Sequence, residues 1–279
     1  MVSAEEFSQK FQFRQDMHLH IGIEQECFLA RGGVIAPIAP EIVPAIKRAS
    51  SIQCIDIGYE LSAYQLEHRI GPVKIKNVRE ELRNVEARLK QEELRHNFKR
   101  IYTEVAPDNL PLDVYPDPAG RYQALATNMP LDVLRAACQV AGTHIHIGMA
   151  DKMVAIPVYN RAVTLCQELI EMGDNSNGKR MSLYRKVAGD SMPPRYNNWN
   201  DFYKSALKRG FADNPRNCWD LIRISKHGTI EFRMFGATCD PDLILKWAAF
   251  CRNICAKEEW TGEWWTDHTG HIWSATGHG

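Results

Sequence analysis

Four segments of the chain alternate apolar and polar residues with a period of two, the pattern of a β-strand that has two different faces. They cover residues 18–26, 61–70, 143–147 and 229–234. One face of each segment is apolar, and the other carries carboxylates, histidines or arginines. A sheet face that only meets water normally carries a mixture of Lys, Thr, Ser and Glu. The concentration of metal-binding and phosphate-binding side chains therefore predicts an active site laid on a sheet.

The polar faces of these segments supply the first candidate site residues. Same-face neighbours on one strand lie roughly 6.5–7 Å apart, so side chains from adjacent strands can meet a common ligand. The residues are His18, His20, Glu24 and Glu26 from the first segment, Gln65, Glu67 and Arg69 from the second, His144 and His146 from the third, and Glu231 and Arg233 from the fourth.

Stretches with helical periodicity separate the strands. Residues 76–102, 121–140 and 153–172 are expected to be helical, and a further helix is expected to begin at Asp240-Pro241 and to end near residue 256. Because strands and helices alternate irregularly, we expect an α+β fold in which an antiparallel β-sheet has helices packed on one face.

The strands and helices are expected to form one domain. The segments 219–225 and 229–235 flank Lys226-His227-Gly228 and predict a β-hairpin. No internal repeat or interdomain linker is visible, so a single domain is expected over residues 1–279, with a motif-bearing core of about 18–256 and a tryptophan-rich tail of no clear periodicity.

The least regular long segment covers residues 179–200 and contains Gly189 and Pro193-Pro194. Polar loops of this length in a compact domain are usually lids or binding loops. The sequence therefore predicts that this segment borders the active site.

Composition narrows the partners of such a site. The 279 residues carry 34 basic and 34 acidic side chains, so the formal net charge is zero. No global electrostatic field then recruits nucleic acid or an acidic membrane, and an anionic substrate must be held by local charges and metal ions.

No apolar run reaches the roughly 20 residues of a membrane span, and the first residues lack the hydrophobic core of a signal peptide. The eight cysteines form no CxxC pair, which favours reduced, buried thiols in a cytoplasmic protein. Whether the chain forms a homo-oligomer stays open.

The carboxylates predict a divalent cation. Glu24, Glu26, Glu67 and Glu231 are expected on one sheet face, where they would repel one another strongly unless cations neutralise them. Taken singly, each would most simply be a solvated surface residue; four on matched strands are harder to explain in that way. Oxygen ligands with a single imidazole suit Mg²⁺ or Mn²⁺ better than Zn²⁺.

The two histidines of the third strand leave an alternative open. A lone strand histidine is usually a packed or hydrogen-bonded residue, but His144 and His146 lie beside the carboxylate strands. A zinc hydrolase built on this pair would need a further ligand, which His18 or His20 could supply.

The arginines indicate what the metal ions would face. Arg223 and Arg233 are expected on neighbouring strands beside Glu231, and Arg69 and Arg121 lie near the other motifs. Guanidinium groups next to magnesium-binding carboxylates are typical of phosphoryl transfer. Because the chain has neither a GxxxxGK[ST] nor a GxGxxG motif, metal ions and arginines on a sheet would have to hold the phosphates.

Taken together, these segments resemble the glutamate–cysteine ligase type 2 family of carboxylate–amine ligases, which share the glutamine synthetase fold. Single motifs are weak, but six occur in order over roughly residues 20–250. They are Gly22-Ile23-Glu24-Gln25-Glu26-Cys27-Phe28, Gln65-Leu66-Glu67, Arg121-Tyr122-Gln123 with the Ala141–Gly148 strand, Met192-Pro193-Pro194 with Trp199-Asn200-Asp201-Phe202, Trp219-Asp220-Leu221-Ile222-Arg223, and Gly228-Thr229-Ile230-Glu231-Phe232-Arg233.

The resemblance implies an ATP-dependent ligase that phosphorylates a small carboxylate and lets an amine attack the acyl phosphate. It implies the following roles: Glu24, Glu26, Glu67, His146 and Glu231 as ligands of Mg²⁺ or Mn²⁺; Arg223, Arg233 and Glu67 as catalytic residues; Arg223, Arg233, Arg69 and His144 as ATP contacts; and Arg121, Tyr122, Arg195, Trp199 and Trp219 as contacts of the acid or the amine.

Two other classes of function remain open at this point. A metal-dependent hydrolase using the histidine and carboxylate site should need no nucleotide. A non-catalytic relative should bind nucleotide without turnover, although the four intact glutamates argue against loss of activity. The sequence does not identify the acid or the amine.

Overall fold

The protein is described by a computed structural model that covers residues 2–49, 56–189 and 192–257. Cys54 and the tryptophans of the predicted tail, from Trp260 onwards, lie outside these ranges.

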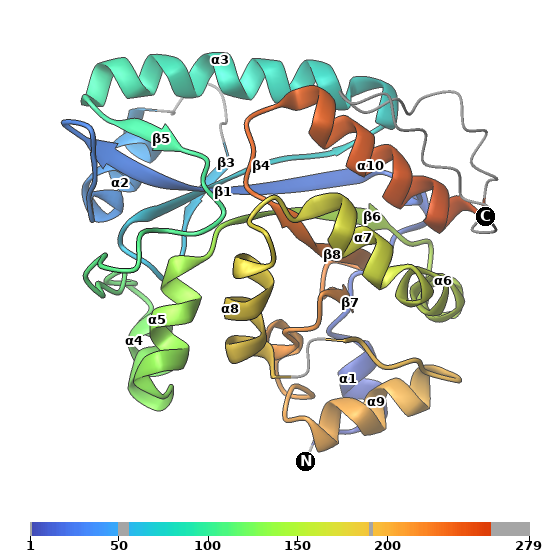
Figure 1. Ribbon diagram of the computed structural model, residues 1–279. Coiled ribbons are helices and arrows are strands. Elements are labelled where there is room, and N and C mark those ends of the chain that lie inside the picture. Colours follow the sequence, from blue (N-terminus) through green and yellow to red (C-terminus); the bar gives the residue numbers. More distant parts are fainter. Residues whose placement is uncertain (1, 50–55, 190–191, 258–279) are drawn as a thin grey trace.

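The centre of the fold is an eight-stranded antiparallel sheet with the strand order β3-β4-β1-β6-β8-β7 (Figure 1). Two short strands, β2 and β5, pair with the far half of β1. The four segments with period-two alternation form β1, β4, β6 and β8, which are adjacent in the sheet. The strands are β1 (Ile21–Arg31), β2 (Val34–Ile35), β3 (Asp56–Tyr59), β4 (Gln65–Val73), β5 (Lys99–Ile101), β6 (Gly142–Gly148), β7 (Ile222–Ile224) and β8 (Thr229–Gly236).

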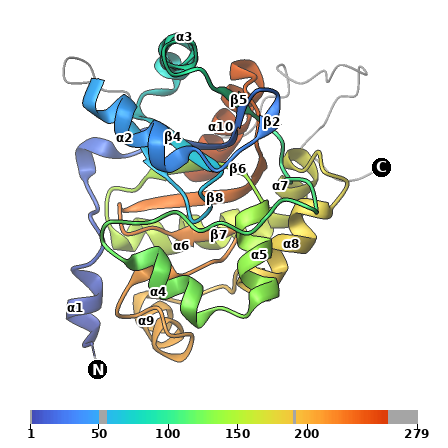
Figure 2. The ribbon, with the colours of Figure 1, turned by 90° about the vertical axis from the view of Figure 1, so that its left-hand side faces the viewer.

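Helices cover both sides of this sheet. Helices α3, α6, α7 and α10 pack against β4, β7, β8 and β6 respectively. The views in Figures 1 and 2 place α3 and α10 above the sheet and α4, α5 and α8 below it. The helices are α1 (Ala4–Ser8), α2 (Ala39–Ala49), α3 (Val78–His96), α4 (Arg121–Asn128), α5 (Leu131–Gln139), α6 (Lys152–Thr164), α7 (Cys166–Gly173), α8 (Lys179–Ala188), α9 (Trp199–Lys208) and α10 (Pro241–Ala256), with short 3-10 turns at Gln15–Met17, Ile75–Asn77 and Pro215–Asn217.

The prediction that helices pack on one face of the sheet is therefore only partly correct. Residues Leu134 and Cys138 of α5 pack with Leu61 in an apolar cluster of their own, separate from the main core. This second cluster has its own helical wall, which α5 supplies together with Tyr122 and Ala126 of α4.

The main core lies between the apolar faces of the strands and the helices above them. Ile23, Ile145 and Phe232 are almost completely buried on these faces, and Trp247 of α10 stacks on Phe235 with ring centroids 4.9 Å apart. Burying one such side chain stabilises the fold by about 1.5–3 kcal/mol. The alternation that predicts the strands thus also fixes which face meets the helices.

Several boundaries differ from the predictions because the backbone turns where the pattern continues, and the strand of the second alternating segment begins at Gln65 rather than at residue 61. The first strand begins at Ile21 rather than at residue 18, since Leu19 adopts a positive φ of 58° and breaks the extended chain. His18 and His20 are therefore not on the strand face. The helix predicted over 76–102 ends at His96, where Asn97 takes the left-handed conformation (φ 50°) and reverses the chain into β5.

Two other segments also depart from expectation. The helix predicted over 153–172 is split into α6 and α7 at Leu165. The segment predicted to be irregular over 179–200 begins with the ten residues of α8.

The prediction of reduced, buried cysteines holds for six described residues; Cys239 is free but exposed. Among the described residues, no helix combines the length and apolar character needed to cross a membrane.

Candidate active site

The register of the strands aligns the predicted site residues into rows across the sheet. Between β1 and β4, Glu26 is paired with Glu67, and Glu24 with Arg69. Between β1 and β6, Glu24 is paired with His144. One row therefore runs from Arg69 through Glu24 to His144.

The next row continues on the other side of β6. There His146 is paired with Glu231 of β8, and Glu231 with Arg223 of β7. Gly22 of β1 lies on the far side of His146, and a side chain at that position would lie 3.5 Å from the Cβ atom of His146. The absence of a side chain there leaves room beside the imidazole.

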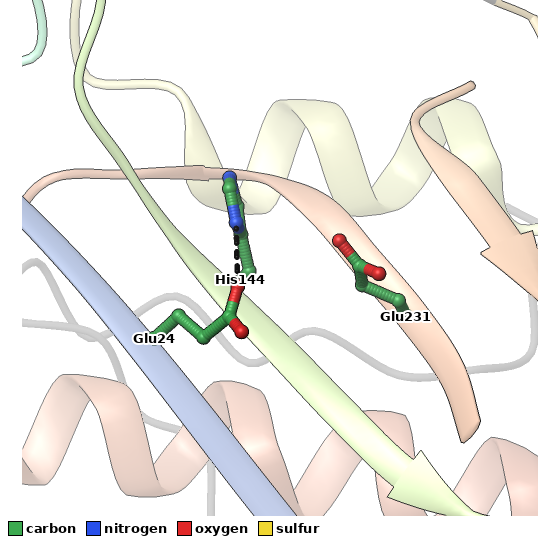
Figure 3. A group of neighbouring side chains, drawn as sticks. All are labelled: Glu24, His144 and Glu231. Atoms are coloured by element: carbon green, nitrogen blue, oxygen red, sulfur yellow. Dashed lines mark hydrogen bonds and ion pairs between the residues drawn. The ribbon is translucent and has the colours of Figure 1, made fainter. Parts of the chain in front are cut away.

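These rows form the floor of a cleft of about 850 Å³. Arg121 and Tyr122 of α4, and Trp219 of the segment before β7, line its sides. In Figure 3, Glu24, His144 and Glu231 reach from three neighbouring strands toward one another. The structure thus brings the charged faces of β1, β4, β6, β7 and β8 together in one place.

Two groups of side chains have ligand atoms close enough to hold a metal ion. The ligand atoms within each group lie within 4.8 Å of one another, and the groups are Glu24, His144 and Glu231, and Glu26, Glu67 and His144. Four carboxylates and an imidazole offer mostly oxygen atoms, which fits Mg²⁺ or Mn²⁺.

The positions of the two histidines can be compared with the roles that the resemblance implies. His144, expected to contact ATP, belongs to both groups. His146, expected to bind a metal ion, has its Nδ1 atom 2.9 Å from the Thr229 hydroxyl, while its Nε2 atom lies 3.5 Å from Glu24 and 4.0 Å from Glu231. This buried Nε2 atom has no hydrogen-bond partner. Both imidazoles therefore have a nitrogen among the carboxylates.

The carboxylates repel one another on the β4 side of the cleft. Burial, together with the nearby charges of Glu24 and Glu60, raises the pKa of Glu67 well above its ordinary value. Burial and the charge of Glu26 raise the pKa of Glu60 to about 7. Buried carboxylates that raise one another's pKa in this way favour a bound cation, which would neutralise their charge.

Glu60 was not predicted from the sequence. It lies between β3 and β4, outside the alternating pattern, but it lines the same cleft. Its neighbour Tyr59 ends β3, and nothing in the local sequence marks the turn that follows as part of a site.

Glu231 joins the metal side of the cleft to the arginines. Its carboxylate accepts hydrogen bonds from Arg223 Nε at 2.7 Å and from Arg233 Nη1 at 2.5 Å, and its side chain is fully buried. Burial alone would raise the pKa of Glu231, but the nearby positive charges of Arg223, His146 and Arg233 lower it. A phosphate group close to Glu231 would meet both guanidinium groups.

Arg69 is already engaged by carboxylates. It forms ion pairs with Glu67, with Asp56 at 3.3 Å and, more loosely, with Glu24 at 3.9 Å. Its expected contact with ATP would require exchange of these partners, whereas its present contacts hold Glu67 in place.

A second group of cations, Arg121, Arg216 and Lys226, also lines the cleft. Burial and the positive charges of Arg216 and Arg121 lower the pKa of Lys226. Within the ranges that the structure describes, none of these three side chains forms an ion pair. Cations that repel one another around a common space favour an anionic ligand. Lys226 and Arg216 were missed because they lie in turns, where charged residues are common.

Aromatic rings form the wall next to Arg121. Tyr59 stacks on Tyr115 with centroids 4.1 Å apart, and Tyr122 meets Tyr59 edge-on at 5.8 Å. The Arg121 guanidinium lies 5.4 Å from the Tyr122 ring, and that of Arg233 lies 5.9 Å from the Trp219 ring. Arg121, Tyr122 and Trp219 thus lie where a substrate could touch them.

Two predicted substrate contacts lie outside the cleft. Arg195 is exposed and does not line it. Trp199 begins α9 and packs against Phe7, Phe11 and Phe13 with centroid distances of 5.1–6.1 Å. An aromatic cluster with the N-terminal segment, which the motif does not show, thus holds the indole ring away from the cleft, and a substrate contact by either residue stays a prediction.

Of the two histidines before β1, only His20 lines the cleft. Its buried Nδ1 atom has no hydrogen-bond partner. His18 does not line the cleft and so is not positioned as an extra ligand there.

Comparisons with known proteins agree with the resemblance seen in the motifs. No family model matches the chain. A protein of Solibacter usitatus named "Putative glutamate–cysteine ligase 2" is 27% identical over 159 residues, which are 52% of this chain and 40% of the relative. A protein of the same name from Chloroflexus aggregans is 25% identical over 177 residues, which are 58% of this chain and 45% of the relative. The chain therefore spans less than half the length of these curated relatives.

A solved structure shows a similar fold. The bifunctional glutathione synthetase from Pasteurella multocida superposes with a TM-score of 0.52 over 83% of this chain and 38% of that chain, at 14% sequence identity. The likeness to glutamate–cysteine ligase 2 proteins is thus confirmed, and the arrangement of an antiparallel sheet with helices is shared with a solved ligase.

Proposed function

We propose that this chain carries the active site of an ATP-dependent, ADP-forming carboxylate–amine ligase. The observation that carries the proposal is the position of Glu231, whose carboxylate lies next to a metal-binding group and also binds Arg223 and Arg233. Cations and guanidinium groups that meet at one point are suited to neutralising charge on a phosphoryl group in transfer. The names of the relatives point to the same class of enzyme.

The side chains present fit divalent cations. Beyond the oxygen-rich donor sets, the buried His146 Nε2 atom has no hydrogen-bond partner and lies 3.5 Å from Glu24, as expected of a metal ligand. Glu24, Glu26, Glu67, His144 and Glu231 would hold Mg²⁺ or Mn²⁺, with His146 as a further ligand. The bound ions would screen the charge of the ATP phosphates and align them with the acid.

The protein residues would then act in three places. Arg223 and Arg233 would bind the transferred phosphoryl group and stabilise its charge, since both are fixed on Glu231. The cations Arg121, Arg216 and Lys226 would hold the anionic ends of the substrates. Trp219 and Tyr122 would supply apolar walls that exclude water from the acyl phosphate until the amine attacks it.

We further propose that residues 18–256 form one catalytic domain of the glutamine synthetase type. This proposal is supported by the antiparallel order of the strands and by the six sequence motifs. Five of these motifs contribute residues to the cleft. Glutamate and cysteine are the substrates named by the relatives' titles, but the cleft itself only calls for a small anionic acid and an amine.

The test is a screen of ATP turnover in the presence of Mg²⁺ with panels of small acids and amines. We expect ADP and phosphate to form only when an acid is present, and hydroxylamine to trap the activated acid as a hydroxamate. AMP and pyrophosphate would indicate an acyl-adenylate route and contradict the proposal.

The same screen separates the two alternatives. A metal-dependent hydrolase would act on its substrate without ATP. A non-catalytic relative would bind ATP and release no ADP with any acid. Glu67→Gln is the matched inactive control, because it keeps the size of a metal-binding side chain and removes its charge.

A further inference from the structure

Helix α8 presents two side chains, one turn apart, to the strand that carries Arg233. Arg180 is 1% exposed and Tyr184 is 5% exposed, although the segment was expected to be an irregular loop. Neither residue lines the cleft. Both contact Arg233, which does line the cleft.

Arg180 binds the backbone of the two residues that form a β-bulge. Between the pairs Ile145–Phe232 and Thr143–Phe235, β8 carries one more residue than β6. The guanidinium of Arg180 donates to the carbonyl oxygens of Arg233 at 3.0 Å and Met234 at 2.8 Å. An extra residue in a strand leaves carbonyl groups without partners in the sheet, and here Arg180 satisfies them.

The third hydrogen bond of Arg180 reaches the neighbouring strand. Its Nε atom donates to the carbonyl of Ala141 at 2.9 Å. The next residue, Gly142, donates its N–H to Glu26 at 2.7 Å, and a side chain at position 142 would collide with the Arg180 guanidinium. Arg180 therefore fixes the backbone beneath both Arg233 and Glu26.

Tyr184 holds the other end of Arg233. Its hydroxyl accepts a hydrogen bond from Arg233 Nε at 2.9 Å and donates one to the carbonyl of Trp219 at 2.9 Å. With Glu231 on Nη1, the Arg233 side chain is held at two atoms, and its backbone is held by Arg180. The same hydroxyl binds the backbone carbonyl of Trp219, the residue whose ring the Arg233 guanidinium faces.

We propose that Arg180 and Tyr184 are positioning residues that set the direction of the Arg233 guanidinium toward the transferred phosphoryl group. This inference rests on the proposed ligase activity, and it assigns a role to a helix outside the cleft. Filling space in the core does not explain a buried arginine, because burying a guanidinium costs more free energy than burying an apolar side chain of similar volume.

The first experiment removes one hydroxyl. In Tyr184→Phe, Arg233 Nε loses its acceptor, so we expect kcat to fall roughly 10-fold while the KM for ATP stays within about twofold, because orientation matters most in the transition state. The matched control is Tyr159→Phe, which removes another buried hydroxyl that donates to a backbone carbonyl, that of Pro194. The control should leave kcat unchanged.

A double-mutant cycle shows whether the effect passes through Arg233. Lysine has no Nε–H group of this geometry, so in an Arg233→Lys background the change Tyr184→Phe should alter kcat by less than about twofold. An equal loss in both backgrounds would overturn the inference. Arg180→Lys, which cannot reach all three carbonyls, should also lower kcat with little change in KM. Tyr184→Phe, Tyr159→Phe and Arg180→Lys should unfold within a few degrees of one another.

A readout without turnover separates this inference from the ligase assignment. The Nε–H of Arg233 should give an NMR signal that exchanges slowly with solvent. The signal is assigned to Arg233 by its loss in Arg233→Lys. We expect Tyr184→Phe to abolish its protection from exchange and Tyr159→Phe to preserve it. Retained protection in Tyr184→Phe would overturn the inference even if the enzyme is a ligase. If the wild-type chain shows no ATP turnover with any acid, the proposed function fails while this signal still reports the contact.

Discussion

The two faces of β8 are equally buried and yet have different tasks. Glu231 on the cleft face and Phe232 on the helix face both have no exposed surface. Phe232 belongs to the main apolar core, whereas Glu231 lies between two guanidinium groups and a histidine. Burial alone therefore does not distinguish core from site. What distinguishes them is whether the surrounding groups are apolar or charged.

The comparison leads to opposite expectations for stability. Removing apolar volume from the helix face leaves a cavity that the fold does not refill. On the cleft face the outcome depends on the charge of the neighbours. Removing the Glu231 carboxylate would leave two buried guanidinium groups unpaired. Removing the charge of Glu67, which its acidic neighbours repel, relieves that repulsion but takes away a ligand. Each prediction below tests one side of this contrast.

The largest effect is expected on the helix face. Phe232→Ala should lower the free energy of unfolding by about 3–5 kcal/mol, because the ring is fully buried in the main core. Urea unfolding followed by circular dichroism measures this loss. If the variant stays as stable as the wild type but loses ATP turnover, the two faces of β8 have been assigned the wrong way round.

The next effect is expected on the cleft face of β4. Glu67→Gln should reduce ATP turnover at least ~10²-fold, the usual scale for the loss of an electrostatic catalytic group. Its stability should stay equal or rise, since burial and its acidic neighbours already raise the pKa of Glu67. The matched control is Glu80→Gln on the exposed surface of α3, which should change neither property. A Glu67→Gln protein with full turnover would contradict the assignment of the cleft.

A smaller effect is expected from pH in the absence of divalent cations. The pKa of Glu60 is raised to about 7 in the folded protein, so protonation favours the folded state. This stabilisation is complete below the ordinary carboxyl pKa near 4.5 and is lost as the pH rises through about 7. The chelated protein should therefore unfold at a lower temperature at about pH 8 than at about pH 6.

Added Mg²⁺ should counter this loss. We expect the unfolding temperature to rise by roughly 2–4 °C at about pH 8 and by less at about pH 6, where the carboxyls hold protons instead. Differential scanning fluorimetry with and without chelator measures both shifts. An Mg²⁺ effect that is larger at the lower pH would contradict the proposed repulsion among the carboxylates.

The sequence predicts the sheet well because period-two alternation is a local property. Glu24, Glu26 and Glu231 could be placed on one face without knowing which strands pair, since every alternate residue of a strand shares a face. Which of them meet depends on register, and this decides that His144 belongs to both metal groups. Register depends on the whole sheet and is not visible in any single segment.

The residues that the sequence did not predict correctly are those whose position depends on tertiary structure. Glu60 and Lys226 lie in turns, where no periodicity marks the direction of a side chain, and only the folded chain brings them to the cleft. Trp199 was assigned through a motif, but aromatic residues of the first fourteen positions pack around it. Arg180 was hidden because its segment, with glycine and prolines nearby, did not suggest a helix.

The most direct test of the cleft is the binding of Mn²⁺, because it needs no knowledge of the acid or the amine. Electron paramagnetic resonance measures free Mn²⁺ as the protein is titrated. The two metal-binding groups predict two saturable ions per wild-type chain, fewer or weaker ions in Glu67→Gln, and unchanged binding in Glu80→Gln. Wild-type protein that binds no Mn²⁺ saturably, or Glu67→Gln protein that binds it as the wild type does, would contradict the claim that the charged face of the sheet is a metal and phosphate site.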